Sequence, residues 1–458
     1  MRLAAEAAIA YRLGVPDRPV PPACDLDTAV ARFRTPLAEA GIPAAEVIET
    51  LVHETDDGLN QMTSPGFYGY VLGGSHPVGV AADMLVSAWG QNAGSSAETP
   101  AVTGLERAVC DWVIDLLGLP PESGAGITTG ATVGNTAAIL AARNALCARA
   151  GWDVEARGLF GAPGIAVIMG ADAHSAPSAA LRYAGFGTER TLLADTDDQG
   201  RIRPESFERC LASVDGPVLV VLQAGQINSG ASDPFAELIP MARARDAWVH
   251  VDGAFGLWLA AVPELAPRLA GVQEADSWAV DLHKWLNAPF DAGMAIVRDR
   301  TALVASMSAR GAYLPDLTGH WEPTDSVPEL SRRARGVPSY AILRHLGRAG
   351  VREMVARHCA LAKGIAAEIS DLPGLSVLNE VASNQVAIRC GEDAEGDAQT
   401  REVLRQVQRR GRVYPSHGTW QGRDIIRVSV IGYATQKAHA DLLVSEIAEA
   451  WQIVRGGN

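Results

Sequence analysis

The hydrophobic positions of the chain form two patterns, short continuous runs and helical repeats. Continuous apolar runs bounded by turn residues predict buried strands at residues 165–169, 218–223, 248–251, 277–280 and 293–297. The run at 218–223 is so uniformly apolar that it is typical of a parallel sheet covered on both faces. Residues 103–117 instead carry apolar residues at helical spacing, which predicts a helix packed against the core.

The two ends of the chain differ from this central part. Helical repeats predict helices at 3–13, 28–40 and 43–59, with a proline-rich break at 16–22. Beyond residue 340 the pattern predicts a long helix to about residue 369 with a break near Gly350. It then predicts strands at 375–378, 385–389 and 425–430 and helices at 399–410 and 436–454. We therefore expect a helical N-terminal segment (1–60), a large domain (61–340) and a small C-terminal α+β domain (341–458).

Length, charge and cysteine content narrow the class of protein. The 458 residues are 48% hydrophobic and 20% charged, as in globular proteins, and carry a formal net charge of -14. This charge argues against nucleic acid or an anionic membrane as the main partner, but it allows a small anionic ligand. The six cysteines lack metal-type spacing, so no metal site is predicted. Because the chain shows neither a signal-peptide pattern nor a membrane-spanning apolar run, we expect a soluble, cytoplasmic protein with reduced thiols.

The candidate chemistry centres on Lys284, which lies between two predicted buried strands. A charged ammonium is costly there, so the lysine reaches solvent, pairs with an acid, or loses its charge by condensing with a carbonyl. Asp252 ends another apolar strand 32 residues upstream. A lysine that forms a Schiff base and an acid that faces a pyridinium nitrogen are the minimum set for pyridoxal 5'-phosphate (PLP). An ordinary lysine of a surface loop is the alternative interpretation.

The stretches 250–256 (HVDGAFG) and 281–287 (DLHKWLN) resemble motifs of the group II pyridoxal-dependent decarboxylases, in particular the aromatic-L-amino-acid and tyrosine decarboxylases. The similarity runs in matching order from about residue 65 to the C-terminus. It implies the α/β fold of PLP fold type I: a mainly parallel seven-stranded sheet between helices, a small C-terminal α+β domain and a helical N-terminal segment. It also implies a homodimer in which the N-terminal segments wrap the partner subunit, whereas an ordinary helical cap is the alternative for these segments.

A glycine- and threonine-rich turn at residues 126–135 precedes a helix rich in alanine and leucine. Small residues at a helix N-terminus let backbone N–H groups face an anion, and the helix dipole adds to the attraction. An ordinary helix cap has the same pattern. The resemblance implies that Ala131, through its backbone, and Thr132 bind the cofactor phosphate. Val133 and Gly134 stand where many family members have an acidic residue and alanine.

The resemblance implies catalytic roles for Lys284, His174 and Asp252. Lys284 would carry the cofactor as a Schiff base. His174 follows a strand end, the edge where open α/β sheets bind ligands, and would stack on the pyridine ring and take part in proton transfer. Asp252 would keep the ring nitrogen protonated, so that the ring absorbs electrons released at the α-carbon. A structural role is the alternative for a lone histidine.

Three further residues have roles implied by the resemblance. Ala254 would be the small residue that lets the ring lie flat. His283 would touch the phosphate, and structural hydrogen bonding is its equally weighted alternative. Tyr70, in the aromatic and glycine-rich stretch 65–75, would contact the substrate.

The sequence departs from the family pattern in two loops. Gln226 and Ile227 replace threonines found in most of these decarboxylases, and Asn228 is a candidate polar contact to the cofactor or the substrate carboxylate. The long segment 306–335 is predicted to be a lid or a disordered segment. The family tyrosine that protonates the carbanion has no counterpart at its matching place, because Tyr313 lies earlier and Trp321-Glu322 occupies the vicinity. In relatives where that tyrosine is changed, the product is an aldehyde.

We therefore predict PLP-dependent decarboxylation of an L-amino acid, with an aromatic substrate weakly favoured, to the amine and carbon dioxide. The alternatives are another PLP reaction on the same scaffold, either decarboxylation with oxidative deamination or transamination. A non-catalytic homologue is disfavoured because the lysine, acid, histidine and phosphate loop are all present. The basic run at 329–335 resembles a family segment near the cofactor and dimer interface, and a solvated helix start is its alternative.

Overall fold

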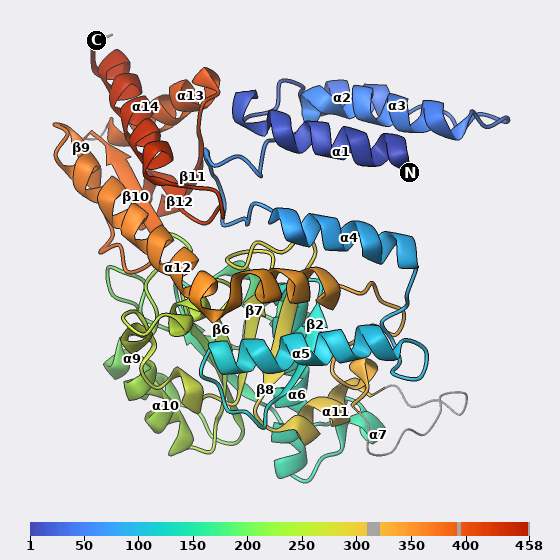
Figure 1. The fold of residues 1–458 in the computed structure, drawn as a ribbon. Helices are drawn as coiled ribbons and strands as arrows, with labels where there is room; N and C mark the ends of the chain where they lie inside the picture. Colours follow the sequence, from blue (N-terminus) through green and yellow to red (C-terminus); the bar gives the residue numbers. More distant parts are fainter. Residues whose placement is uncertain (309–320, 392–394, 457–458) are drawn as a thin grey trace. The chain divides into compact units, whose positions relative to one another are not determined.

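The computed structural model describes residues 1–308, 321–391 and 395–456, which form two compact units (Figure 1). The first unit comprises Met1–Gly74, Lys363–Leu378 and Val386–Asn458, and the second comprises Ser75–Ala362 and Asn379–Gln385. The three-domain division expected from the sequence stays a prediction, because spatial grouping does not establish which segments fold independently.

The second unit is built on a seven-stranded sheet with the strand order β2-β8-β7-β6-β5-β3-β4. Neighbouring strands from β7 to β4 run parallel, whereas β8 runs antiparallel to both β2 and β7. The strands are β2 (Gly124–Thr128), β3 (Ala166–Gly170), β4 (Thr191–Ala194), β5 (Val218–Gln223), β6 (Trp248–Asp252), β7 (Ser277–Asp281) and β8 (Gly293–Val297). Every residue of β5 to β8 is buried, which explains their continuous apolar runs.

Helices surround this sheet (Figure 1), and α6 contacts more of its strands than the other helices do. Helix α6 (Ala131–Arg149) packs across β2, β6, β7 and β8, and its many buried alanines allow a close approach to the sheet. The other helices of this unit are α4 (Pro77–Trp89), α5 (Pro100–Leu116), α7 (Val154–Arg157), α8 (Ser175–Tyr183), α9 (Pro204–Ala212), α10 (Phe235–Arg243) and α11 (Arg300–Met307). Helix α12 (Gly336–Ser370) begins here and bends at Gly347, close to the break expected near Gly350.

Three neighbouring parallel strands of this sheet end in polar residues. Gln223 ends β5, Asp252 ends β6 and Asp281 ends β7, and Gln223 pairs in register with Asp252. The carboxyl edge of a parallel sheet is where ligands bind in open α/β folds. The predicted position of Asp252 at a strand end is therefore confirmed, and the fold brings two more polar side chains to the same edge.

The first unit combines N-terminal helices with a small sheet. Helices α1 (Arg2–Gly14), α2 (Leu26–Phe33) and α3 (Ala44–Thr55) lie where three helices were expected, but α2 ends at Phe33 rather than near residue 40. The five-stranded sheet has the order β1-β11-β12-β10-β9. Its members are β1 (Phe67–Tyr68), β9 (Leu375–Val377), β10 (Gln385–Cys390), β11 (Tyr414–Trp420) and β12 (Arg423–Ser429), and it is accompanied by α13 (Gly396–Arg410) and α14 (Lys437–Gly456).

The predicted fold class, α/β with a mainly parallel seven-stranded sheet, a smaller α+β part and N-terminal helices, is confirmed. In the described parts of the chain, no helix combines the length and apolar composition required to span a bilayer.

Candidate active site

A pocket of about 280 Å³, including space open to solvent, lies at the carboxyl edge of the large sheet. It is lined by His174, Gln223, Gly225, Ile227, Asp252, Ala254, Phe255 and Lys284. The structure thus brings four of the predicted site residues together around one cavity. The sequence has three lysines, and Lys284 differs from the exposed Lys363 and Lys437 because its side chain is only 18% exposed.

Lys284 lies in the turn between β7 and β8, as the two apolar runs predicted. Its Nζ atom is 3.0 Å from Oδ2 of Asp281, the last residue of β7. Of the three alternatives named for this lysine, pairing with an acid is present within the chain. Asp281 was not among the predicted site residues, although an acid that ends a buried strand three residues before the lysine is a recognisable signal.

Asp252 is fixed at the end of β6 with its carboxylate in the pocket. Its Oδ1 atom accepts a hydrogen bond of 3.1 Å from the backbone N–H of Ala254. Burial raises the pKa of the Asp252 carboxyl above its usual range, and the nearby Lys284 charge acts in the opposite direction. A buried carboxylate is stabilised by a cation close to it, so this position suits a protonated ring nitrogen.

His174 stands at the start of α8 on the rim of the pocket. Its backbone N–H donates to Oε1 of Gln223 at 3.1 Å, and its Nδ1 atom accepts from the backbone N–H of Ala176 at 3.2 Å. Because Nδ1 accepts a hydrogen bond, the ring proton of the neutral imidazole lies on Nε2. The hydrogen bond at Nδ1 therefore orients the ring relative to the start of α8.

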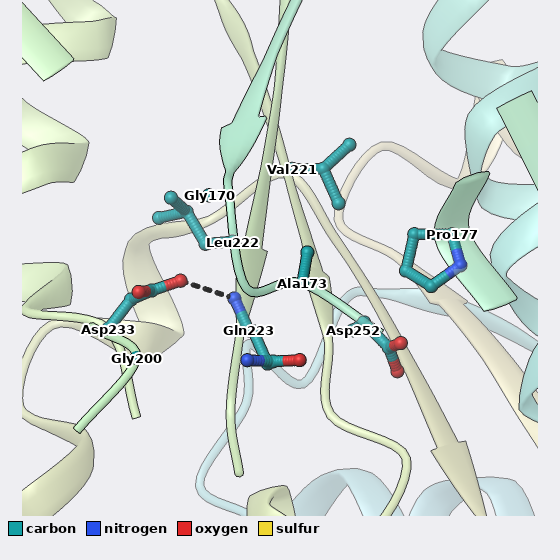
Figure 2. Close-up of a pocket in the computed structure, with 9 residues that line it drawn as sticks. All are labelled: Gly170, Ala173, Pro177, Gly200, Val221, Leu222, Gln223, Asp233 and Asp252. Carbon is teal, nitrogen blue, oxygen red and sulfur yellow. Dashed lines mark hydrogen bonds between the residues drawn. The ribbon is translucent and has the colours of Figure 1, made fainter. Parts of the chain in front are cut away.

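Gln223, which was not among the predicted site residues, hydrogen-bonds to both His174 and Asp233 at this edge of the sheet. Its backbone N–H donates to Oδ2 of Asp233 at 2.7 Å, and its side chain lies between Asp233 and Asp252 in the view of a neighbouring cavity of about 260 Å³ (Figure 2). The other oxygen of Asp233 accepts from the backbone N–H of Ile202 at 2.9 Å. Asp233 therefore ties two loops to the strand that carries Gln223.

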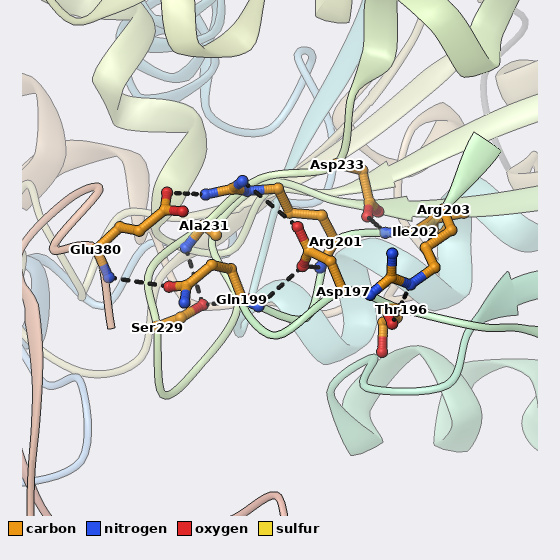
Figure 3. A network of polar contacts seen from close by, with 10 residues as sticks. All are labelled: Thr196, Asp197, Gln199, Arg201, Ile202, Arg203, Ser229, Ala231, Asp233 and Glu380. Carbon is orange, nitrogen blue, oxygen red and sulfur yellow. Dashed lines mark hydrogen bonds and ion pairs between the residues drawn. The ribbon is translucent and has the colours of Figure 1, made fainter. Parts of the chain in front are cut away.

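A network of polar contacts holds the loop after β5, which contributes Gly225 and Ile227 to the pocket (Figure 3). The hydroxyl of Ser229 donates to the carbonyl of Gln199 at 2.6 Å, and the Gln199 side chain accepts from the backbone N–H of Glu380 at 2.9 Å. Residues that do not line the pocket therefore hold the loop that bears Ile227 in place.

Gln226, which departs from the family pattern, and Asn228, the candidate polar contact, are mostly buried within this loop. Oε1 of Gln226 accepts from the backbone N–H groups of Asn228 and Ser229 at 2.6 and 2.9 Å, so Gln226 shapes the loop. Asn228 is 6% exposed, and its contact with cofactor or carboxylate stays a prediction.

The predicted phosphate-binding turn leads into α6. The geometry of an α-helix leaves the first backbone N–H groups, here those of Ala131 and Thr132, without acceptors inside the helix. A Cβ atom on Gly130 would lie 3.1 Å from the His283 ring, and one on Gly293 would lie 2.6 Å from the Gly130 backbone. A side chain at Gly293 would collide with the Gly130 backbone, and one at Gly130 would crowd the His283 ring, so both positions favour glycine.

His283 lies beside this turn. Its Nδ1 atom accepts from the backbone N–H of Ala292 at 3.1 Å, and its Nε2 atom is 3.5 Å from Oδ1 of Asp281. Burial lowers the pKa of His283. The structural hydrogen bonding named as one alternative is present, and a contact with the phosphate stays a prediction.

These residues fit PLP. Lys284, partly buried, and Asp252, buried, line one pocket. The N-terminus of α6, where Gly130 and Gly293 pack closely, lies beside the same lysine. Lys284 would hold the aldehyde carbon, Asp252 the ring nitrogen, and the first turn of α6 the phosphate. One contact opposes the phosphate: Oδ1 of Asp281 accepts from the Ala131 N–H at 2.5 Å.

Three predictions involve other parts of the chain. Tyr70 belongs to the first unit, where its backbone N–H donates to Ser416 Oγ at 3.2 Å, and its contact with substrate stays a prediction. Tyr313 and residues 309–320 of the predicted lid lie outside the described residues. In the basic run 329–335, Arg332 is buried rather than solvated, which corrects the alternative of a solvated helix start at that residue.

Comparison with known proteins identifies the family. Residues 37–390 match the family profile described as the pyridoxal-dependent decarboxylase conserved domain. The chain is 27% identical to phenylacetaldehyde synthase of Arabidopsis thaliana over 434 residues, which cover 89% of this chain and 86% of that protein. It is 26% identical to tryptophan decarboxylase 2 of Oryza sativa subsp. japonica over 415 residues, 87% of this chain and 81% of that protein. The crystal structure of Oryza sativa TDC with PLP and tryptamine has a TM-score of 0.90 at 23% identity, covering 98% of this chain and 96% of that one.

The fold and the pocket define an enzyme of the PLP fold type I class. The chain belongs to the pyridoxal-dependent decarboxylase family, and its cofactor is PLP.

Proposed function

We propose that this enzyme decarboxylates an L-amino acid to the amine and carbon dioxide, with Lys284 carrying the cofactor. The observation that carries the proposal is that Lys284 and Asp252 line one pocket, with His174 at its rim. PLP, when bound, supplies an aldehyde for an amine and a ring that accepts the electron pair left when a bond at the α-carbon breaks.

The residues of the chain would divide the work as follows. Lys284 would hold the cofactor through its amine, at the aldehyde carbon. Asp252, at the end of β6, would hold a proton at the ring nitrogen. His174 would stack on the ring and move a proton at Nε2, since its Nδ1 atom accepts the Ala176 N–H.

The remaining site residues would bind and orient. The backbone N–H groups of Ala131 and Thr132 hold the phosphate, with His283 beside them. Ala254 provides a small side chain in the pocket wall, so that a flat ring has room. Tyr70 would contact the substrate.

An aromatic L-amino acid is the proposed substrate class. Relatives that cover most of this chain are named as tryptophan and tyrosine decarboxylases, which supports this choice. Phe255, 2% exposed, also offers an aromatic wall to the pocket. Stacking against aromatic side chains favours aromatic ligands.

A second reaction is favoured by one specific observation, the 27% identity to a phenylacetaldehyde synthase. Together with the missing loop tyrosine, it supports decarboxylation with oxidative deamination. In that reaction the amino acid, dioxygen and water give an aldehyde, carbon dioxide, ammonia and hydrogen peroxide, so dioxygen is the oxidant and is reduced to peroxide. The products therefore separate the two proposals.

The test incubates purified protein and PLP with each of the twenty amino acids and measures carbon dioxide, amine, aldehyde, ammonia and peroxide. We expect carbon dioxide with an equimolar amount of amine from an aromatic amino acid. Lys284→Ala should abolish turnover, whereas Lys363→Ala and Lys437→Ala, at exposed lysines, should not. Borohydride reduction and peptide mapping should place the cofactor on Lys284, and a label on either other lysine contradicts the proposal.

We further propose that the enzyme is a cytoplasmic homodimer. Helices α1 to α3 have no buried residue and expose large apolar side chains, among them Leu13, Phe33 and Leu51. A second copy of the chain would cover them. All six cysteines are free thiols, which supports a reducing compartment. Light scattering at increasing dilution tests the dimer.

A further inference from the structure

A carboxylate occupies part of the phosphate-binding turn. Oδ1 of Asp281 accepts the backbone N–H of Ala131, the first residue of α6, at 2.5 Å. Its other oxygen, Oδ2, is 3.0 Å from Nζ of Lys284. One side chain therefore bridges the amide expected to bind the phosphate and the amine expected to bind the aldehyde.

The backbone of Asp281 is held in place. Its N–H donates to the carbonyl of Ala254 at 2.9 Å, and its carbonyl accepts from Nε1 of Trp258 at 3.0 Å. The side chain is only 4% exposed, and a Cβ atom on Gly130 would lie 3.3 Å from Oδ1. The carboxylate is therefore buried beside the Gly130 backbone, where a second anion that enters the turn would lie next to it.

Two anions would then share one electropositive helix end. A phosphate monoester carries about −1.5 to −2 charges near pH 7 and seeks the same N–H groups that Asp281 already uses. The nearby His283 offers little positive charge, because burial lowers its pKa. The cation that offsets Asp281 is Lys284, which the proposed function commits to the aldehyde.

We propose that Asp281 is a positioning residue with two opposed effects: it holds the Lys284 amine beside the pocket, and it competes with the cofactor phosphate for the N-terminus of α6. The inference rests on the proposed function, in which Lys284 carries PLP. Its consequence is that the phosphate group adds less to cofactor affinity than it would beside an uncharged side chain. Asparagine in this position keeps an oxygen for the Ala131 N–H and removes the charge.

The test compares the dissociation constants of PLP and of pyridoxal, which lacks the phosphate, for wild type and Asp281→Asn. Binding is followed by the visible absorbance of the protein-bound aldehyde, and borohydride mapping verifies that both ligands reach Lys284. A change in the reactivity of the Lys284 amine alters the dissociation constants of PLP and pyridoxal alike. The ratio of the two constants therefore reports only the contribution of the phosphate group to binding. We expect Asp281→Asn to raise the preference for PLP over pyridoxal by about tenfold or more, equivalent to about 1.4 kcal/mol.

Two further variants make the comparison decisive. Asp281→Ala should shift the ratio in the same direction, and it serves if the asparagine variant does not fold. Asp276→Asn is the matched control, since Asp276 precedes the opposite end of β7 and also accepts a backbone N–H, that of Val249, at 2.7 Å. It should leave the ratio at the wild-type value.

The outcomes separate the two proposals. If PLP labels Lys284 in wild type while both Asp281 variants leave the ratio within twofold of wild type or lower it, the inference about Asp281 is wrong and the proposed function stands. If PLP does not label Lys284 in wild type, the proposed function fails and this inference fails with it.

Discussion

The guanidinium of Arg332 lies 2.6 Å from the carboxylate of Glu106, and both side chains are completely buried. Arg332 also donates to the carbonyl of Ala93 at 3.1 Å and to that of Ile127. Burial raises the pKa of Glu106, while Arg332 lowers it. This pair joins α5 to the segment that precedes α12, and it connects both to β2.

Removal of the arginine should be costly, because it leaves an unpaired acid in the core. Arg332→Met is expected to lower the free energy of unfolding by about 3–5 kcal/mol. The adjacent Arg333→Met is the control: its pair with Asp83 is partly exposed and should be worth less than about 1 kcal/mol. Urea denaturation measures both, and equal losses from the two variants contradict the assignment.

The sequence predicted those parts of the molecule that local pattern determines. The strands that carry Asp252 and flank Lys284 are continuous apolar runs, and their ends could be read directly. Strand β11 was not predicted, because its sequence PSHGT mixes polar residues with proline and glycine and has no apolar run.

The contacts that complete the site depend on residues distant in sequence. Asp281 and Ala131 are 150 positions apart, and only the pairing of β7 with β8 and of β8 with β2 brings the strand end beside the helix. Arg332 and Glu106 are 226 positions apart, so a buried arginine within a basic run has the same local pattern as a solvated one. Neither relationship follows from periodicity or composition.

Close packing against β8 explains why glycine stands at position 134, where many family members have alanine. A Cβ atom on it would lie 2.7 Å from the carbonyl oxygen of Met294 in β8, and backbone cannot move away cheaply. We expect Gly134→Ala to lower the free energy of unfolding by about 1–3 kcal/mol. Gly104→Ala, in α5 with open space around it, should be neutral or stabilise the protein by up to about 1 kcal/mol. If chemical denaturation shows Gly134→Ala to be as harmless as this control, α6 does not pack against β8 this closely.

The buried His250 should make the fold sensitive to acid. Its Nε2 atom is 2.8 Å from Oδ1 of Asn135 and its Nδ1 atom is 3.0 Å from Oγ of Ser277, and burial lowers the pKa of His250 to about 3. An unfolded histidine takes up a proton below about pH 6.5. Between pH 6.5 and pH 3 the unfolded chain binds more protons at this histidine than the folded chain does. The stability that comes from burying neutral His250 is therefore fully present above about pH 6.5 and is lost as the pH falls towards 3.

The expected slope from this one group is at most about 1.4 kcal/mol per pH unit. His250→Asn should be less stable at pH 7 but should lose stability less steeply between pH 6.5 and 4. His53→Asn, at an exposed position of α3, should keep the wild-type slope. Denaturation midpoints across this range measure the slope, and identical slopes for wild type and His250→Asn contradict a buried neutral histidine.

The charge of Asp252 should matter for turnover more than for cofactor binding. Asp252→Asn keeps an oxygen for the Ala254 N–H but cannot hold a proton at the ring nitrogen as a carboxylate does. We expect kcat to fall by about 10²–10³-fold while PLP still labels Lys284, since the lysine and the first turn of α6 are unchanged. Asp276→Asn removes a carboxylate outside the pocket and should retain turnover. Steady-state kinetics with PLP content measured in the same samples separates the two effects. Full activity in Asp252→Asn would show that the carboxylate does not serve the ring, whereas loss of PLP together with activity would assign Asp252 to cofactor binding instead.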